Sequence, residues 1–277
     1  MTHDLAVCSW SLQPGSPQQL VERVRDCDLS VIQLHLDPLR SGGWSEQDLV
    51  ARLSDAGIRI ASGMMTTQGE DYSTLESIRE TGGLRPDATW QTNLEAAEQN
   101  AELARRLGVS LVTLHAGFIP HDRDDPEYAS IVERIRIVAD VFAAHGIQLG
   151  LETGQETAAS LLDALADIDR DSVGVNFDPA NMILYAMGDP VEALARLAPH
   201  ILQIHIKDAI ATDTPGQWGT EVPAGTGQVD WPAFFAVIRD RLPEIALVIE
   251  REAGDQRIED IRTAASLIEK HAEVIRA

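Results

Sequence analysis

The sequence predicts an α/β fold in which eight parallel strands close into a (β/α)8 TIM barrel. Short apolar runs alternate eight times with amphipathic stretches, which is the pattern of strand–helix units on a parallel sheet. The length of 277 residues fits such a barrel, which typically needs about 250. No Gly-x-Gly-x-x-Gly follows the first strand and no Gly-Lys-Ser/Thr loop occurs, so a dinucleotide-binding or P-loop fold is disfavoured. We therefore expect one barrel domain over residues 1–277.

The expected strands are short and apolar on both faces, as buried parallel strands are. Each one is followed by a turn and then by a helical pattern. We predict them over residues 5–10, 31–36, 58–64, 110–115, 147–152, 173–177, 201–206 and 247–250.

The amphipathic stretches predict helices, several of which have recognisable ends. Ser16 precedes Pro17, which is a capping residue followed by proline at the first helical position. Gly57 and Gly108 stand where a helix ends in a left-handed residue, and Asp230 stands where another helix begins. The predicted helices cover residues 17–26, 46–56, 91–107, 126–145, 156–167, 190–196, 231–240 and 256–275.

Three connections are long, and each follows a predicted strand. They cover residues 66–88, 117–125 and 209–229. Long ordered connections in a compact domain are usually functional. The last one is apolar, punctuated by glycine, and carries Trp218 and Glu221. It predicts a lid or pocket wall over the barrel mouth, and the alternative is a loop that only packs on the barrel.

The charge balance narrows the classes of partner. The chain has 44 acidic and 22 basic residues, which gives a formal net charge of −22. Such a field repels phosphate backbones, so we expect no nucleic-acid partner. No apolar run reaches the length of a membrane span, so we expect no membrane partner either.

Cysteine usage and the N-terminal residues point to a cytoplasmic location. Cys8 and Cys27 are the only cysteines, too few for a disulfide framework, which favours a reducing compartment. The first residues lack the basic and long apolar regions of a signal peptide. Cys8 lies in an apolar run and is expected to be a small buried hydrophobic residue.

Four side chains that could bind a metal ion end four successive predicted strands. They are Glu152, Asp178, His205 and Glu250. All strands of such a barrel point their C-terminal ends at one face, where the chemistry of these folds takes place. Three carboxylates and one imidazole suit Mn²⁺, Mg²⁺ or Co²⁺, with Zn²⁺ as a further alternative. These residues could also be unrelated polar strand ends, but their occurrence on four consecutive strands favours a metal site.

The same residues suggest a reaction. Four protein ligands leave coordination positions for two substrate oxygens, and the ion would act as a Lewis acid on a carbonyl and its neighbouring hydroxyl. Glu152 and Glu250 would form a proton shuttle across a ketose. One glutamate removes the proton next to the carbonyl to give a cis-enediolate, and the other returns a proton.

Three motifs carry a resemblance to a known family over nearly the whole chain. They are F-D-P-A-N at 177–181, H-I-K-D at 205–208, and W-G-T-E-V-P-A-G-T-G-Q-V-D-W at 218–231. Their order resembles the xylose isomerase-like (β/α)8 superfamily, and the last motif looks like the group called sugar phosphate isomerase/epimerase. In ketose 3-epimerases of this fold a glutamate, an aspartate, a histidine and a second glutamate hold the metal, and the two glutamates are the acid–base pair.

The resemblance implies those roles for the four strand-end residues above, but two positions depart from it. Asn181 stands where the epimerases have a substrate-binding histidine. Lys207 is the nearest cation where they have an arginine. The apurinic-site endonucleases of this fold use further histidines that are missing here, which argues against a DNA-repair role.

Five residues are candidates for substrate binding. His115 ends a predicted strand and either points into the pocket or is a core histidine. Lys207 could neutralise an enediolate oxygen, pair with Glu152, or form a structural ion pair. Trp218 could stack on the apolar face of a sugar. The other two candidates are Asn181 and Glu221.

The function expected from these observations is a metal-dependent isomerase or epimerase of a ketose sugar or sugar phosphate. Mn²⁺ is the ion we expect first. The alternative within the superfamily is a lyase, such as a keto-sugar or inosose dehydratase or a C-glycoside deglycosidase. A non-catalytic barrel that binds metal and sugar is the third reading. The partner is a small carbohydrate, weakly favoured to be unphosphorylated, and a homo-oligomer is an open alternative because barrels of this superfamily often pair.

Overall fold

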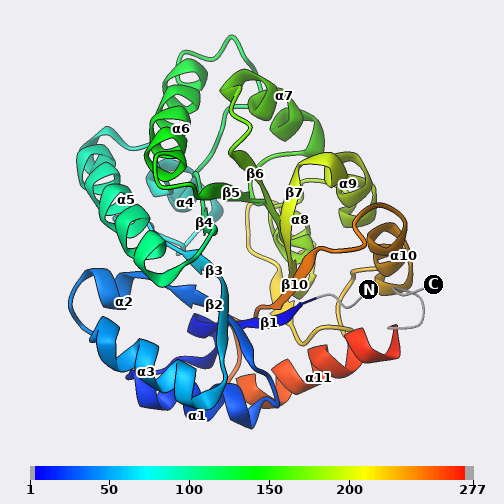
Figure 1. Ribbon diagram of the computed structural model, residues 1–277. Helices are drawn as coiled ribbons and strands as arrows, with labels where there is room; N and C mark the ends of the chain where they lie inside the picture. The colour runs from blue at the N-terminus through cyan, green and yellow to red at the C-terminus, as the bar shows by residue number, and fades with distance from the viewer. Residues whose placement is uncertain (1–3, 272–277) are drawn as a thin grey trace.

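Eight parallel strands close into a barrel in the computed structural model, which describes residues 4–271. Around the barrel their order is β1-β10-β7-β6-β5-β4-β3-β2, and Figure 1 shows them encircled by helices. The strands are β1 (Leu5–Cys8), β2 (Val31–His35), β3 (Arg59–Met64), β4 (Leu111–Leu114), β5 (Gln148–Glu152), β6 (Val173–Phe177), β7 (Ile201–Ile206) and β10 (Ala246–Ile249). The predicted (β/α)8 barrel is confirmed, whereas a single domain over residues 1–277 stays a prediction.

The helices that follow the barrel strands form the outer layer (Figure 1). They are α1 (Pro17–Asp26), α3 (Glu46–Ala56), α5 (Asp87–Leu107), α6 (Tyr128–Ala143), α7 (Ala158–Ile168), α9 (Pro190–Leu197), α10 (Trp231–Arg241) and α11 (Arg257–Lys270). None of the helices within residues 4–271 combines the length and the apolar character needed to cross a membrane.

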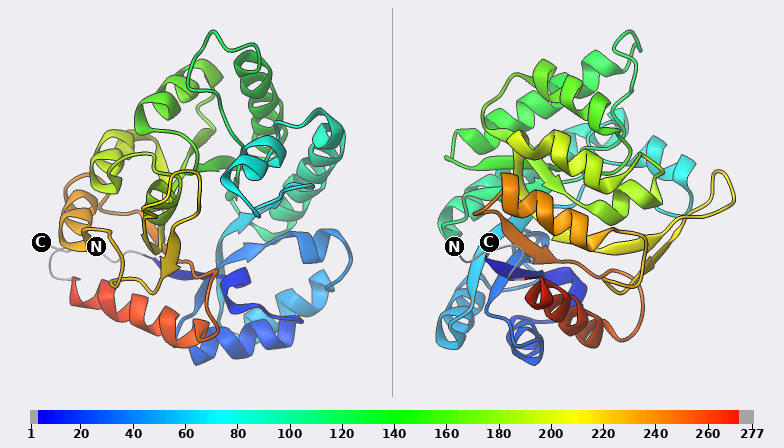
Figure 2. Two further views of the ribbon diagram at one scale, coloured as in Figure 1. Left: turned by 180° about the vertical axis from the view of Figure 1, so that it is seen from behind. Right: turned by 90° about the vertical axis from the view of Figure 1, so that its right-hand side faces the viewer.

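Shorter elements follow the C-terminal ends of several strands and build up the mouth of the barrel. They are the 3-10 helix η1 (Ser9–Leu12), α2 (Asp37–Arg40), α4 (Leu75–Thr81), α8 (Pro179–Leu184) and the antiparallel pair β8 (Asp208–Ile210) and β9 (Thr220–Val222). A further 3-10 helix, η2 (Ala198–His200), precedes β7. In Figure 2 the loop between β8 and β9, drawn in yellow, extends beyond the barrel.

The predicted strand over residues 5–10 is too long. The strand ends at Cys8, and the chain turns into η1, whose Ser9, Ser11 and Leu12 are buried. Periodicity cannot separate a short apolar strand from a buried turn that continues it. The consequence is that Trp10 leaves the barrel wall and turns toward the mouth.

Other boundaries differ where local contacts add short helices. The predicted loop 66–88 contains α4 and the start of α5. Helices α2 and α8 were not predicted, because each is too short for a helical period to be recognised in the sequence. The predicted helix 256–275 corresponds to α11, and its residues 272–275 lie outside the described part of the chain.

The strands are buried on both faces, but part of the inner face is polar, where apolar side chains were expected. On β2, Ile32 and Leu34 belong to the core beneath the helices, whereas Gln33 bonds to groups inside the barrel. On β6, Val175 and Phe177 alternate in the same way with Asn176. The alternation places a layer of amides and hydroxyls inside the barrel, directly below its mouth.

One glycine allows two chain segments to touch next to the mouth. Gly83 has a φ of +68°, and a Cβ built on it would lie 2.1 Å from the carbonyl carbon and oxygen of Ala116. The N–H of Leu84 donates to that carbonyl oxygen at 2.9 Å. The segment before α5 is thereby held against the residues that follow His115.

This contact predicts a difference between two glycine substitutions with similar backbone angles. Gly108 has a φ of +70°, and its Cβ would meet nothing within 4 Å. Gly108→Ala should lower the free energy of unfolding by about 1–2 kcal/mol, the cost of a left-handed alanine. Gly83→Ala adds a backbone clash and should cost about 3 kcal/mol or more. Urea unfolding of both variants checks this, and equal costs would contradict the close approach.

Candidate metal centre and substrate pocket

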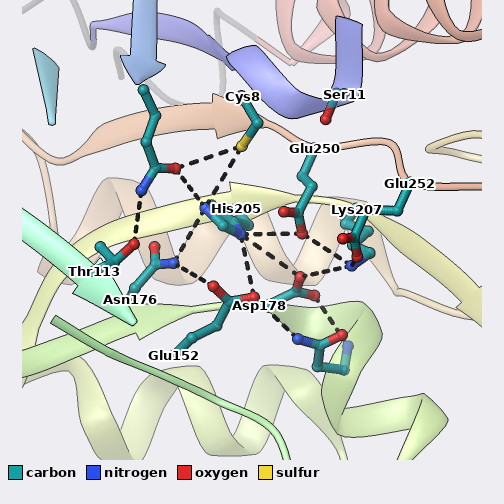
Figure 3. A network of polar contacts seen from close by, with 12 residues as sticks. Cys8, Ser11, Thr113, Glu152, Asn176, Asp178, His205, Lys207, Glu250 and Glu252 are labelled. Atoms are coloured by element: carbon teal, nitrogen blue, oxygen red, sulfur yellow. Dashed lines mark hydrogen bonds and ion pairs between the residues drawn. The ribbon is translucent and has the colours of Figure 1, made fainter. Parts of the chain in front are cut away.

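The structure brings Glu152, Asp178, His205 and Glu250 together at the mouth of the barrel. They come from β5, the residue after β6, β7 and the residue after β10, which are neighbours around the barrel. One ligand atom from each lies within 4.8 Å of the others. All four side chains are buried, with at most 6% of any residue exposed (Figure 3). The cluster can therefore bind a divalent metal ion, as the sequence predicted.

The interior amides fix the orientation of His205. Its Nε2 lies 2.8 Å from Oε1 of Gln33, whose Nε2 donates to Oγ1 of Thr113 at 2.8 Å. Nδ2 of Asn176 also lies 3.1 Å from Nε2, but it donates to Glu152, and the nearer Gln33 oxygen is the acceptor to which the imidazole donates from Nε2. The lone pair of Nδ1 then faces the three carboxylates, which is the tautomer that a metal ligand needs.

Two buried atoms at the centre of the cluster have no hydrogen-bond partner among the described residues. They are Nδ1 of His205 and Oδ2 of Asp178. Carboxylate oxygens of Glu152, Asp178 and Glu250 lie 3.6, 3.7 and 3.3 Å from Nδ1, but without hydrogen-bond geometry. Buried polar atoms are rarely left unpaired. Their convergence on one point fits a cation that would bind them both.

Side-chain amides hold Glu152 in place. Its Oε2 accepts from Nδ2 of Asn176 at 3.0 Å, and its Oε1 accepts from Nδ2 of Asn181 at 3.1 Å. Asn176 is itself oriented by Nε2 of Gln203, which donates to its Oδ1 at 3.0 Å. Asn181 lines the pocket, but its amide is engaged with Glu152, and a substrate contact from it stays a prediction.

Asp178 serves two purposes because it begins a helix. It is the N-cap of α8, and its Oδ1 accepts from the N–H of Asn181 at 3.0 Å. Its Oδ2 remains free to face His205. Burial, its largest influence, raises the pKa of Asp178 in spite of nearby Lys207, so ionisation of this carboxyl in the cluster costs stability.

Glu250 is held by an indole and an ammonium group, and Figure 3 shows the second of these, the Lys207 side chain, beside its carboxylate. Nε1 of Trp10 donates to its Oε1 at 2.8 Å, and Nζ of Lys207 lies 2.9 Å from its Oε2. Lys207 also contacts Oε2 of Glu252 at 2.6 Å and Oδ2 of Asp178 at 3.6 Å. Of the alternatives considered for Lys207, these contacts match an ion pair and do not include pairing with Glu152, because the side chain reaches the opposite side of the cluster.

The cluster carries an excess of negative charge. Burial opposes ionisation of Glu250, but Lys207 and His205 outweigh it and hold the pKa of Glu250 well below its usual range. Burial also opposes the imidazolium of His205, but the charge of Glu250 together with that of Glu152 raises the pKa of His205 well above its usual range. The site thus attracts a positive charge at Nδ1, either a proton or a metal ion.

Cys8 lies beside the ring of His205 and was not predicted to do so. Its Sγ is 3.4 Å from Oε1 of Gln33 and 3.8 Å from Nε2 of His205. Burial raises the pKa of the Cys8 thiol, so it stays protonated and acts as a weak donor to the amide. Gln33 and Asn176 were missed as well, although a single amide within an apolar strand run was a signal that could have found them.

A pocket of about 270 Å³ opens above the cluster. His115, the residue after β4, lines it, with Nε2 3.6 Å from Oε1 of Glu152. Nε1 of Trp218 donates to the backbone oxygen of Tyr72 at 3.1 Å, and the Trp218 ring meets the ring of Tyr185 edge-on at 5.0 Å. The loops 66–88 and 209–229 therefore meet over the pocket, and loop 209–229 forms a pocket wall.

One carboxylate organises that wall. Asp208, at the start of β8, accepts five hydrogen bonds with its two oxygens. The donors are the backbone N–H groups of Ala209, Gly225, Gly227 and Val229 and the indole N–H of Trp231. These bonds tie the end of the H-I-K-D motif to the glycine-rich segment that follows β9.

Glu221 anchors the same wall to the segment after β10. Its Oε1 lies 2.7 Å from NH1 of Arg251 and accepts from the N–H of Glu252 at 2.9 Å, and its Oε2 accepts from the N–H of Ala253 at 3.1 Å. Glu221 lines the pocket, but these contacts engage both of its oxygens. A role for Glu221 in binding substrate stays a prediction.

A further buried acid lies in the loop between β5 and α7. Glu156 is 6% exposed, and its Oε1 accepts from the N–H of Ile119 at 2.9 Å. No Lys or Arg of the described residues pairs with it. Burial raises the pKa of Glu156 to about 7. It was missed because nothing in the local sequence indicates burial.

A family model described as xylose isomerase-like TIM barrel matches residues 21–275. The chain is 31% identical to a solved xylose isomerase domain protein from Planctomyces limnophilus, with a TM-score of 0.83, covering 92% of this chain and 91% of that one. It is 29% identical over 131 residues to 3-dehydroshikimate dehydratase of Bacillus anthracis, covering 46% of each.

It is also 24% identical over 175 residues to a Mycoplasma pneumoniae protein named Probable L-ribulose-5-phosphate 3-epimerase UlaE, covering 61% of this chain and 55% of that one. The similarity to these two curated relatives thus spans about half of their length. Relatives of this fold include proteins named as epimerases and as dehydratases.

Oδ2 of Asp178 is buried without a hydrogen bond. We therefore expect a substitution of Asp178 to affect the stability of the protein in opposite directions with and without metal. Asp178→Asn keeps the N-cap of α8 but removes one buried charge. In chelator the variant should be as stable as the wild type or more stable by about 1 kcal/mol. With excess Mn²⁺ the wild type should gain about 3 kcal/mol and the variant much less. Thermal unfolding in both conditions checks this, and a variant that is less stable in chelator yet keeps the full metal effect would contradict it.

Glu156 predicts a pH-dependent difference in stability. Its pKa in the folded chain is about 7, above its ordinary 4.5, so the folded state binds more protons between these values. The contribution of Glu156 to the free energy of unfolding is therefore lost as the pH rises from 4.5 to 7. Glu156→Gln should match the wild type near pH 4.5 and exceed its free energy of unfolding by up to about 3 kcal/mol at pH 8. Urea unfolding at both pH values tests this, and a pH-independent difference would rule it out.

Proposed function

The chain belongs to the xylose isomerase-like TIM barrel family, and from that premise we propose that it is a metal-dependent enzyme that transfers a proton beside the carbonyl of a small carbohydrate. The first candidate reaction is isomerisation or epimerisation of a ketose through a cis-enediolate. The observation that carries the proposal is the convergence of two buried atoms without a hydrogen-bond partner, Nδ1 of His205 and Oδ2 of Asp178, with two glutamates on one point. Mn²⁺ is the ion that we propose, with Mg²⁺ as the nearest alternative.

We assign the ligand set to Glu152, Asp178, His205 and Glu250. These residues fit a divalent ion because they offer three hard oxygens and one neutral imidazole nitrogen within 4.8 Å of one another. When bound, the ion supplies Lewis-acid polarisation of the substrate carbonyl and stabilises the developing negative charge on oxygen.

The two glutamates approach the cluster from different sides of the barrel. Glu152 comes from β5 and Glu250 follows β10, with β6 and β7 between them around the barrel. Glu250 is held ionised by Lys207, which suits it to remove a proton from the carbon next to the carbonyl. Glu152 is held by neutral amides beside His115, and it would return to the substrate a proton that it takes from the imidazole of His115. Return to the opposite face of the same carbon gives an epimer, and return to the neighbouring carbon gives an isomer.

Lys207 and His115 would support the proton transfers while keeping their contacts with Glu250 and Glu152. Nζ of Lys207 lies at the floor of the pocket, where its charge would stabilise a developing enediolate oxygen. Nε2 of His115 is 3.6 Å from Glu152 and could donate to a substrate hydroxyl or to that carboxylate. Trp218 and Tyr185 cover the pocket and would exclude water from the reacting carbon.

A lyase is the second candidate, and a specific observation favours it. The chain is 29% identical over 131 residues to a protein named as a dehydratase. Elimination begins with the same proton abstraction, after which a hydroxyl leaves from the adjacent carbon as water. The product separates the two reactions, because a lyase forms an unsaturated or diketo species and an epimerase forms an isomer.

The proposal predicts the behaviour of two glutamine variants. Glu152→Gln and Glu250→Gln should each lower deuterium incorporation from D₂O into a ketose panel by about a hundredfold or more, because each removes a group that carries the proton. Glu244→Gln, an exposed glutamate in the turn before β10, is the matched control and should keep the wild-type rate. Proton NMR of the recovered sugars measures exchange and identifies the product. Wild-type exchange in both folded glutamine variants would refute the assignment.

A further inference from the structure

We propose that the pocket selects an uncharged sugar over a phosphorylated or carboxylated one, and that Glu252 is the residue that sets this selection. The inference rests on the proposed function, since it names the substrate class of the same site. Its basis is the distribution of charge over the pocket wall.

Lys207 is the one Lys or Arg side chain among the described residues that line the pocket. Its positive charge is already compensated by neighbouring carboxylates. Its Nζ lies 2.9 Å from Glu250, 2.6 Å from Glu252 and 3.6 Å from Asp178. The side chain is 3% exposed. An ammonium that is surrounded by three carboxylates has little positive potential to offer an incoming phosphate.

The cation next to Glu250 in the sequence is also unavailable. Arg251 is not one of the residues that line the pocket, and its guanidinium is engaged, with Nη1 2.7 Å from Glu221 and Nε 2.8 Å from Asp260. Only 7% of the residue is exposed. The N–H of Asn181 at the start of α8 is engaged as well, because it donates to Asp178. Phosphate sites use free arginine, lysine or backbone N–H groups, and neither of these two cations nor this N–H is free to bind one.

Glu252 adds a negative charge at the entrance. Its side chain is 53% exposed and lines the pocket, so an incoming ligand meets it before reaching Lys207. Even with a divalent ion bound, four carboxylates would face the three positive charges of the ion and Lys207. The four are Glu152, Asp178, Glu250 and Glu252. An anionic ligand is repelled there, whereas a sugar hydroxyl can donate a hydrogen bond to the Glu252 carboxylate.

The test uses paramagnetic relaxation in Mn²⁺-loaded protein. Inorganic phosphate, followed by its ³¹P relaxation, probes anion access without requiring a fit to the sugar pocket. The wild type should relax it weakly, and Glu252→Gln should raise its occupancy about tenfold, as expected for one charge at a partly solvated site. Glu244→Gln removes the same charge from an exposed turn and should leave the phosphate signal unchanged. In parallel, ¹³C relaxation should show D-fructose binding to the wild type more tightly than D-fructose 6-phosphate.

Two results would overturn the inference. One is equal phosphate occupancy in the wild type and Glu252→Gln, and the other is tighter binding of D-fructose 6-phosphate than of D-fructose to the wild type. If the protein takes up Mn²⁺ and exchanges substrate protons, either result contradicts the proposed substrate class but not the proposed function. Failure to take up metal defeats both.

Discussion

The constraint on which the rest of the structure depends is the burial of three carboxylates and one imidazole within 4.8 Å of one another. Two carboxylates at that distance repel each other by about 3 kcal/mol at the effective dielectric of a protein site. Lys207 compensates part of this charge from one side, and a proton on His205 or a divalent ion compensates it at the centre. The cluster therefore favours a positive charge at its centre, and binding of an ion at Nδ1 would displace the proton that the cluster otherwise attracts there.

The interior of the barrel is arranged to hold that cluster in one geometry. Barrel interiors of this kind are usually filled by branched aliphatic side chains. Here Gln33, Asn176 and Gln203 occupy the layer below the mouth, and each of these amides makes a buried hydrogen bond through both its oxygen and its nitrogen. Such a layer fixes the tautomer of His205 and the position of Glu152, and its hydrogen bonds offset the burial of its polar atoms.

The sequence predicted the barrel and the four clustered residues because strand–helix alternation forces all strand ends to one face. It could not predict which groups support them. The amide that orients His205 comes from a strand far away in the chain, and the indole that holds Glu250 depends on the turn into η1, where a strand was expected. The pairing of Lys207 with Glu250 rather than Glu152 follows from the arrangement of strands around a closed barrel, which local patterns do not contain.

The central claim is that these four side chains hold a divalent ion through Nδ1 of His205. The most direct measurement is electron spin-echo envelope modulation of the protein titrated with Mn²⁺, together with metal analysis. The account predicts about one Mn²⁺ per chain and modulation from a single directly bound imidazole nitrogen. The absence of stoichiometric Mn²⁺, or a bound ion with no nitrogen coupling, would contradict it.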